Sequence, residues 1–159
     1  MGYKLEIELI PQGVMYSSIY QYLKKKGKGT EWKRLKDKIF KKEGKKCWIC
    51  NHGKGNFEAH EFWEYDEKAR IQKLISIHHL CFMCHRIIHI GFSCYTDKGR
   101  EILGSKGITK DDLIRHFCRV NGCSRIDFNR HENEAFKLWE HRNEIDWKQD
   151  FGEFKGLIK

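Results

Sequence analysis

The chain begins with alternating apolar and polar residues, and stretches with apolar residues at helical spacing follow. Residues 3–9 (YKLEIEL) alternate, which predicts a strand at a sheet edge or over the core, ended by Pro11 and Gly13. Mixed apolar spacing predicts a short helix over residues 14–23, and the KKKGKG stretch after it predicts a loop. Residues 1–30 are therefore expected to form a strand, a short helix and a basic loop.

A longer amphipathic helix is expected over residues 31–42. Thr30 is placed to cap its start, and Gly44 is placed to end it. Lysines occupy the faces that its apolar stripe leaves open. The apolar stripe consists of Trp32, Leu35, Ile39 and Phe40.

Two more helices are expected in the last third of the chain. Thr109 and Asp112 resemble a capping pair for a helix over residues 110–120. Apolar residues at helical spacing predict a last helix over residues 130–142. The stretch 96–107 (TDKGREILGSKG) contains three glycines and predicts an irregular connection.

Composition restricts the class of protein. The chain has 159 residues, of which 40% are hydrophobic and one is proline, which indicates a folded globular domain. No apolar run is long enough to span a bilayer, and the first residues lack the features of a signal peptide. We therefore expect a cytoplasmic protein without a membrane-spanning segment.

Positive charge is concentrated in one stretch. Twelve Lys or Arg and three acidic residues lie between Lys24 and Lys46, so this stretch carries as much net charge as the whole chain, which is +9. Such a concentration is typical of a surface that binds phosphates. Anionic lipid and a solvated helix face remain alternatives. The candidate nucleic-acid-binding residues are Lys33, Arg34, Lys36, Lys38, Lys41, Lys42, Lys45 and Arg86.

Four of the seven cysteines form two C-x2-C pairs, Cys47/Cys50 and Cys81/Cys84. Two such pairs supply the four thiolates that structural zinc prefers, and a redox pair would need only one. The sequence therefore predicts a four-cysteine zinc site. The other cysteines lack this spacing and are expected to be buried thiols: Cys94, Cys118 and Cys123.

Histidines cluster around the second pair. His85 and His89 are four residues apart, so a helix starting at this pair would place both imidazoles on one face, as a metal site requires. His60, between the two pairs, is the candidate third ligand. For any one of these histidines taken alone, a structural or surface role is the favoured interpretation, and only the three together indicate a metal site.

Residues 31–90 resemble the HNH nucleases. The runs WKRLKDKIFKKEGKKCWICN, AHEFW and LCFMCHRIIHIG are similar to that family's basic helix, first knuckle, catalytic strand and metal helix. The chain as a whole, including HFCRVNG and AFKLWEHRNEIDW, resembles uncharacterised bacterial or phage HNH proteins. The resemblance implies an α+β protein with a ββα-metal (His-Me finger) core at residues 31–95. The N-terminal strand precedes this core, and a helical extension at residues 96–159 packs on it. All three segments are expected to form one compact unit.

The resemblance implies a metal ligand followed by a general base on the strand. With His60 as the ligand, Glu61 takes the base position, and His60, His85 and His89 hold the metal, as in the colicin nuclease domains. With His60 as the base, the ligand position falls on Ala59, which cannot ligate. The family's central Asn falls on Ser76, with His78 and His79 as possible substitutes.

The resemblance implies an endonuclease that hydrolyses phosphodiester bonds, in DNA more than in RNA, at a second divalent metal. Imidazole ligands suit Mn²⁺, Ni²⁺, Co²⁺ or Zn²⁺ better than Mg²⁺. One alternative is an impaired HNH protein that only binds nucleic acid or a protein partner, and another is a purely structural zinc module. Metal content separates these hypotheses, because only an active nuclease needs a second, exchangeable metal.

Overall fold

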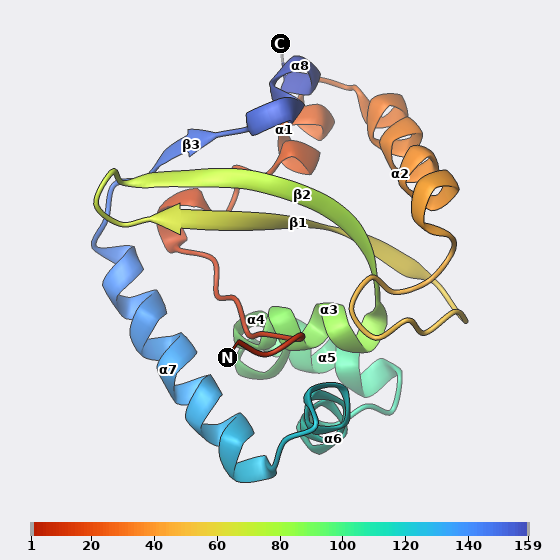
Figure 1. Cartoon of the computed structure of the whole chain (residues 1–159), viewed down its shortest axis with the longest axis vertical. Helices are drawn as coiled ribbons and strands as arrows, with labels where there is room; N and C mark the ends of the chain where they lie inside the picture. Colours follow the sequence, from red (N-terminus) through yellow and green to blue (C-terminus); the bar gives the residue numbers. More distant parts are fainter. Residues whose placement is uncertain (1, 159) are drawn as a thin grey trace.

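The computed structural model describes residues 2–158 and shows a mixed α+β protein with a small three-stranded sheet (Figure 1). β1 (Phe57–Asp66) and β2 (Ile71–Cys81) form a long antiparallel hairpin, and β3 (Lys148–Asp150) pairs with β2 in parallel. The predicted α+β class is confirmed. Residues 1 and 159, the outer ends of the predicted first and third segments, lie outside the described residues.

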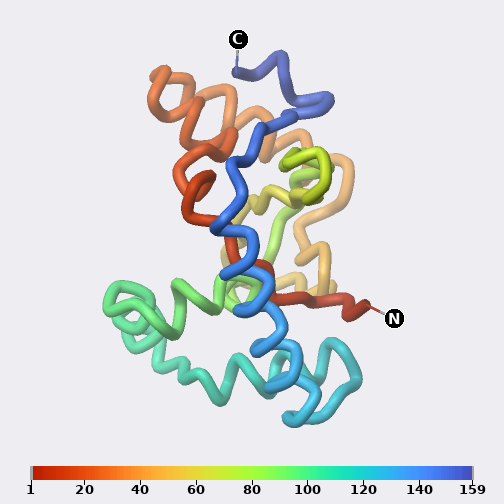
Figure 2. Tube along the Cα trace, turned by 90° about the vertical axis from the view of Figure 1, so that its left-hand side faces the viewer, coloured from red at the N-terminus to blue at the C-terminus, as the bar shows by residue number. Residues whose placement is uncertain are grey.

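The helices form two layers with the hairpin between them, and α7 runs from one layer to the other (Figures 1 and 2). Within residues 2–158, no helix is both long and apolar enough to cross a membrane. One layer contains α1 (Ile19–Lys25), α2 (Gly29–Glu43) and α8 (Lys155–Ile158), with the 3-10 turn η2 (Gly152–Phe154). The other contains α3 (Phe82–Ile88), α4 (Ile90–Tyr95), α5 (Asp97–Ser105) and α6 (Lys110–Asn121), and α7 spans Arg125–Asn143.

Each layer has its own hydrophobic cluster. Leu74 and Ile77 of β2 pack with Leu23 of α1 and Ile39 of α2. On the other side, Leu80 of β2 belongs to the cluster that α3, α6 and α7 build. The hairpin is therefore held from both faces, which fixes the direction of the side chains along β1.

The predicted strand at residues 3–9 is wrong. The segment is extended, but its amides pair mainly with side chains: Leu5 N donates to Asn121 Oδ1 and Ile7 N to His131 Nε2, both at 2.9 Å. The partners lie 116 and 124 residues away, so local alternation could not reveal them. The segment ties α6 and α7 to the core without joining the sheet.

The first helices start at other residues than predicted. A 3-10 turn, η1 (Gln12–Val14), precedes α1, which Ser18 opens in a capping box with Gln21. α2 begins at Gly29, so Thr30 lies inside the helix and does not cap it. Gly44 does end α2, with a φ of 80° that favours glycine.

The predicted irregular connection at residues 96–107 is instead largely helical and contains α5. Thr96 caps this helix by accepting from Gly99 N. A Cβ on Gly99 would lie 1.9 Å from the Phe92 carbonyl oxygen, so this glycine lets α5 pack directly on α4. The glycine that indicated a loop thus serves a close contact between helices.

Predictions for the last helices were more accurate. α6 has the predicted Thr109–Asp112 capping box. α7 starts five residues before the predicted 130, because Ser124 and Asp127 form a second capping box. α6 packs against α3, and its second half supplies His116 and Arg119 to the site described next.

Candidate metal centres

The first cysteine pair lies on a tight turn that is tied to β2. Trp48 N donates to the His79 carbonyl at 2.8 Å, and the Trp48 ring stacks on His78 at a centroid distance of 3.8 Å. Asn51 follows with a φ of 61°, a conformation that Asn tolerates. These contacts hold Cys47 and Cys50 beside the end of the hairpin.

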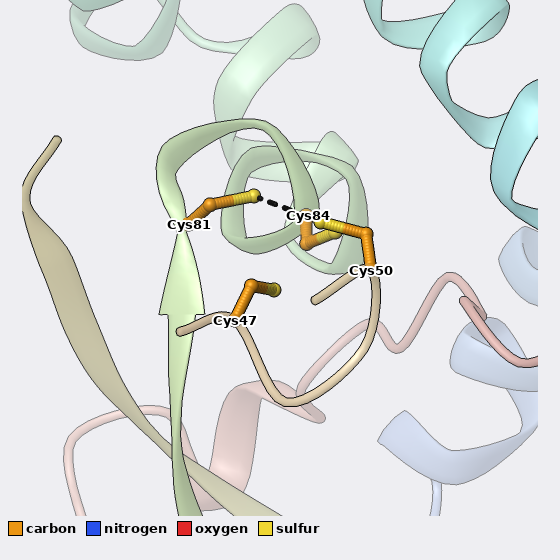
Figure 3. A group of neighbouring side chains, drawn as sticks. All are labelled: Cys47, Cys50, Cys81 and Cys84. Carbon is orange, nitrogen blue, oxygen red and sulfur yellow. Dashed lines mark hydrogen bonds between the residues drawn. The ribbon is translucent and has the colours of Figure 1, made fainter. Parts of the chain in front are cut away.

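The second pair lies where β2 becomes α3. Cys81 ends β2 and precedes α3, and Cys84 lies in the first turn of α3. The sulfur atoms of the four cysteines lie within 4.8 Å of one another, and their side chains converge in Figure 3. Cys50 Sγ and Cys81 Sγ are 3.7 Å apart, close to the roughly 3.8 Å that separates two sulfurs of a tetrahedral site with Zn–S bonds of about 2.3 Å. The four cysteines can therefore hold a metal such as zinc.

Thiol ionisation in this group also favours a cation. Hydrogen bonds from the Cys81 and Cys84 thiols lower the pKa of Cys47. The same contact with Cys47 raises the pKa of Cys84 and, with burial, opposes its ionisation. Thiolates this close together repel one another. A bound metal would offset this repulsion and could be ligated by all four cysteines as thiolates.

His116 of α6 supports the cysteine group from outside. His116 Nε2 lies 3.2 Å from Cys84 Sγ, and Arg119 Nη2 donates to His116 Nδ1 at 2.8 Å. Since Nδ1 accepts, the ring proton lies on Nε2 and points at the sulfur. The sequence reasoning missed His116, whose only signal was a histidine among the buried residues of an amphipathic helix.

The structure brings together the three predicted imidazoles, called here the His group: His60, His85 and His89. His60 comes from β1, His85 from α3, and His89 directly follows α3, with its amide donating to the His85 carbonyl at 3.2 Å. One nitrogen from each lies within 4.8 Å of the others. His60 Nδ1 and His89 Nε2 are 3.2 Å apart, close to the roughly 3.3 Å expected of two nitrogens on one tetrahedral zinc.

Burial keeps two imidazoles of the His group, His60 and His89, neutral. Burial and then the nearby His89 and His85 hold the pKa of His60 well below its usual range. Burial, followed by the charges of His85 and Arg86, lowers the pKa of His89 to about 3. Neutral imidazoles have the lone pairs that a metal needs, so the donor set fits a divalent cation.

Glu58 orients one of these imidazoles, and it was missed from the sequence. His85 Nδ1 donates to Glu58 Oε2 at 2.5 Å, which leaves His85 Nε2 for a metal. The His85 hydrogen bond and, after it, Arg86 lower the pKa of Glu58 to about 2. Residues two apart in a strand share a face, so Glu58 could have been found as the partner of His60 on β1.

We expect Glu58→Ala to weaken metal binding at the His group by about 10–100-fold, the usual effect of losing a carboxylate behind a metal-bound histidine. Titration with Ni²⁺ measures this affinity. Glu64→Ala, at an exposed position of the same strand, is the matched control. An unchanged affinity in Glu58→Ala would show that the carboxylate does not position His85.

Glu61 does not join the His group. Its carboxylate lies 8% exposed and accepts from Ile19 N at 3.2 Å and Tyr20 N at 3.0 Å, the first amides of α1. Neighbouring residues of a strand point to opposite faces, so His60 turns toward α3 and Glu61 toward α1. Burial raises the pKa of Glu61, against these two hydrogen bonds. The structure thus gives Glu61 a capping role.

We expect Glu61→Ala to lower the free energy of unfolding by about 2 kcal/mol, because two amides at the start of α1 lose their acceptor. Urea unfolding measures this loss. Metal affinity of the His group should stay at the wild-type value, and a large fall in that affinity would contradict the capping role.

The candidates for the family's central Asn also lie outside the His group. His78 Nδ1 bonds Glu43 Oε1 at 2.8 Å, and His79 Nε2 bonds the Lys36 carbonyl at 3.0 Å. His79 also stacks on Phe40 of α2. Both histidines therefore attach α2 and the first cysteine pair to the hairpin.

The basic residues predicted to bind nucleic acid lie in three places. One of them, Lys45, lies just after α2, with its Nζ 5.9 Å from the centroid of the Phe40 ring. The residues from Lys33 to Lys42 lie on α2, in the layer that packs on the opposite face of the hairpin from α3 (Figure 1). Arg86 lies on α3 beside the His group, where Nη2 donates to Glu58 at 2.7 Å. The remaining cysteines are half-buried and form neither metal group: Cys94, Cys118 and Cys123.

Comparisons of the chain with protein-family models, with curated proteins and with solved structures found no match.

Proposed function

We propose that the protein is a metal-dependent endonuclease of the HNH type, which hydrolyses phosphodiester bonds in DNA. In this proposal, β1, β2 and α3 are the ββα-metal core. The observation that carries it is the His group, in which a strand and the helix that begins at the second cysteine pair bring three imidazoles together. A cytoplasmic location belongs to the same proposal, because seven free cysteines suit a reducing compartment.

Each residue near the His group has a role in this reaction. A divalent cation bound there would supply positive charge for the scissile phosphate and the leaving oxygen. His60, His85 and His89 hold the cation, and Glu58 fixes the orientation of His85. Glu58 holds Arg86 through Nη2, and the other terminal nitrogen of Arg86 would contact a neighbouring phosphate.

Neither of the two residues predicted as the general base is placed for that role. Glu61 caps α1, and His60 Nε2 is buried without a hydrogen-bond partner within the described residues. This observation favours a second candidate function, an HNH-fold zinc protein that binds nucleic acid or a protein without cutting. Cleavage assays decide between the two.

Supercoiled plasmid, single-stranded DNA and RNA should be incubated with the wild type and His60→Ala across Mn²⁺, Ni²⁺, Co²⁺, Zn²⁺ and Mg²⁺. We expect the wild type to nick DNA with a metal that prefers imidazole ligands, and we expect His60→Ala to lose this nicking. His141→Ala, at an exposed position of α7, is the control and should cut like the wild type. Absence of cleavage with every metal, with DNA binding retained, would support the second candidate.

A further inference from the structure

A large cleft opens beside both metal groups. Its volume is about 1140 Å³. It lies between the loop of residues 50–56, the start of α3, the end of α5 and the C-terminal half of α6. Cys50 and Cys81 form part of its wall, so the four-cysteine group holds two of its sides together. A metal bound by the four cysteines would therefore also stabilise the shape of the cleft.

The cleft is strongly basic. Its wall carries five cations and one carboxylate, Glu58, whose hydrogen bonds go to His85 and Arg86. Apart from Arg86, none of these cations has an ion-pairing carboxylate within residues 2–158, whereas Arg115 and Arg125 on the outer surface both pair with Asp111. The five cations are Lys4, Lys54, Arg86, Lys106 and Arg119.

Two of these cations are held over one aromatic ring. The Arg86 guanidinium and Lys106 Nζ each lie 5.0 Å from the centroid of Phe82, which also lines the cleft. Arg119 is held by its hydrogen bond to the neutral ring of His116. These contacts position positive charge without neutralising it, which is what an anion-binding surface requires.

The cleft extends to two residues that contact His85 of the His group, whereas α2 lies on the other face of the hairpin. Glu58 and Arg86 line the cleft and also contact His85 or its carboxylate partner. α2 packs on the other face of the hairpin, through contacts such as that of His79 with Lys36. A phosphate chain bound in the cleft would therefore pass next to the imidazoles.

We propose that this cleft between α3 and α6 binds the sugar–phosphate backbone of the nucleic acid and leads it to the His group. The inference rests on the proposed function for its ligand class, but it assigns the binding surface to the cleft and not to α2. Lysines and arginines that contact phosphates carry no sequence information, so binding is sequence-independent and strongly dependent on salt.

The test compares two charge reversals of equal size in the zinc-loaded protein without a second metal. Lys54→Glu/Lys106→Glu changes the cleft, and Lys33→Glu/Lys41→Glu changes α2; all four lysines are exposed. Fluorescence anisotropy of a labelled 20-mer, single-stranded and duplex, gives affinity as a function of salt. We expect the cleft variant to bind at least 30-fold more weakly at 100 mM salt, with the salt slope reduced by about 2, and the α2 variant to change by less than 3-fold.

A cleft variant that binds like the wild type, or an α2 variant that loses as much affinity, would overturn the inference. Circular dichroism and zinc content check that both variants are folded, and Lys54→Gln/Lys106→Gln should give about half of the loss in log affinity. If the wild type does not cut DNA but its binding depends on the cleft, only the nuclease proposal fails. If the wild type cuts and the cleft variant cuts and binds equally well, only the cleft inference fails.

Discussion

Cys84→Ser is expected to remove most of the folding stability of the protein. Cys84 is fully buried beside the first cysteine pair and belongs to one hydrophobic cluster. Its loss would remove one of the four sulfurs that can hold a metal such as zinc. Structural zinc contributes about 10–16 kcal/mol in small zinc domains, comparable to the roughly 5–15 kcal/mol that separates most folded domains from the unfolded state. We expect the free energy of unfolding to fall by more than about 4 kcal/mol.

Urea unfolding followed by circular dichroism, with zinc content measured in parallel, checks this expectation. Cys94→Ser is the matched control, since Cys94 is half-buried and belongs to neither metal group. Wild-type stability in Cys84→Ser, or a wild type that keeps its stability after complete removal of zinc, would contradict a structural role for the four cysteines.

His89→Ala is expected to abolish metal binding at the His group and DNA cleavage together. In the proposed site His89 would be one of three ligands. Loss of only an outer partner already costs about 10–100-fold in metal affinity, so we expect a loss of more than about 100-fold. Without the metal, cleavage should fall by about 10³-fold or more, since the cation accounts for several kcal/mol of transition-state stabilisation.

Calorimetric titration with Ni²⁺ and plasmid nicking measure the two effects of His89→Ala. Zinc content and urea stability should remain near the wild-type values, because the four-cysteine group is intact. Retention of cleavage in a variant that no longer binds the second metal would show that the His group is not the catalytic centre.

Local signals predicted the parts of the site that are local in sequence. The two C-x2-C pairs and the spacing of His85 and His89 indicated both ligand sets, and the Thr109–Asp112 pair indicated the start of α6. Each of these signals lies within four positions along the chain. The four-cysteine group also needs two pairs that are 31 residues apart from Cys50 to Cys81, and the His group also needs His60.

Features that depend on distant parts of the chain could not be predicted. The amides of residues 3–9 pair with side chains of α6 and α7, so their alternation did not produce a strand. Gly99 serves helix packing, which a single sequence cannot distinguish from a turn. Glu61 was the predicted base until the structure showed α1 lying against it. The basic cleft is likewise built from residues between Lys4 and Arg119, far apart in sequence.

Titration of plasmid cleavage against an added divalent metal tests the central claim most directly. The protein would first be freed of exchangeable metal while its zinc is retained. We predict that nicking rises with added Mn²⁺ or Ni²⁺, saturates at one equivalent per chain beyond the zinc, and is absent from His60→Ala at every metal concentration. No cleavage at any concentration, or equal cleavage by His60→Ala, would contradict the claim that the His group is a nuclease centre.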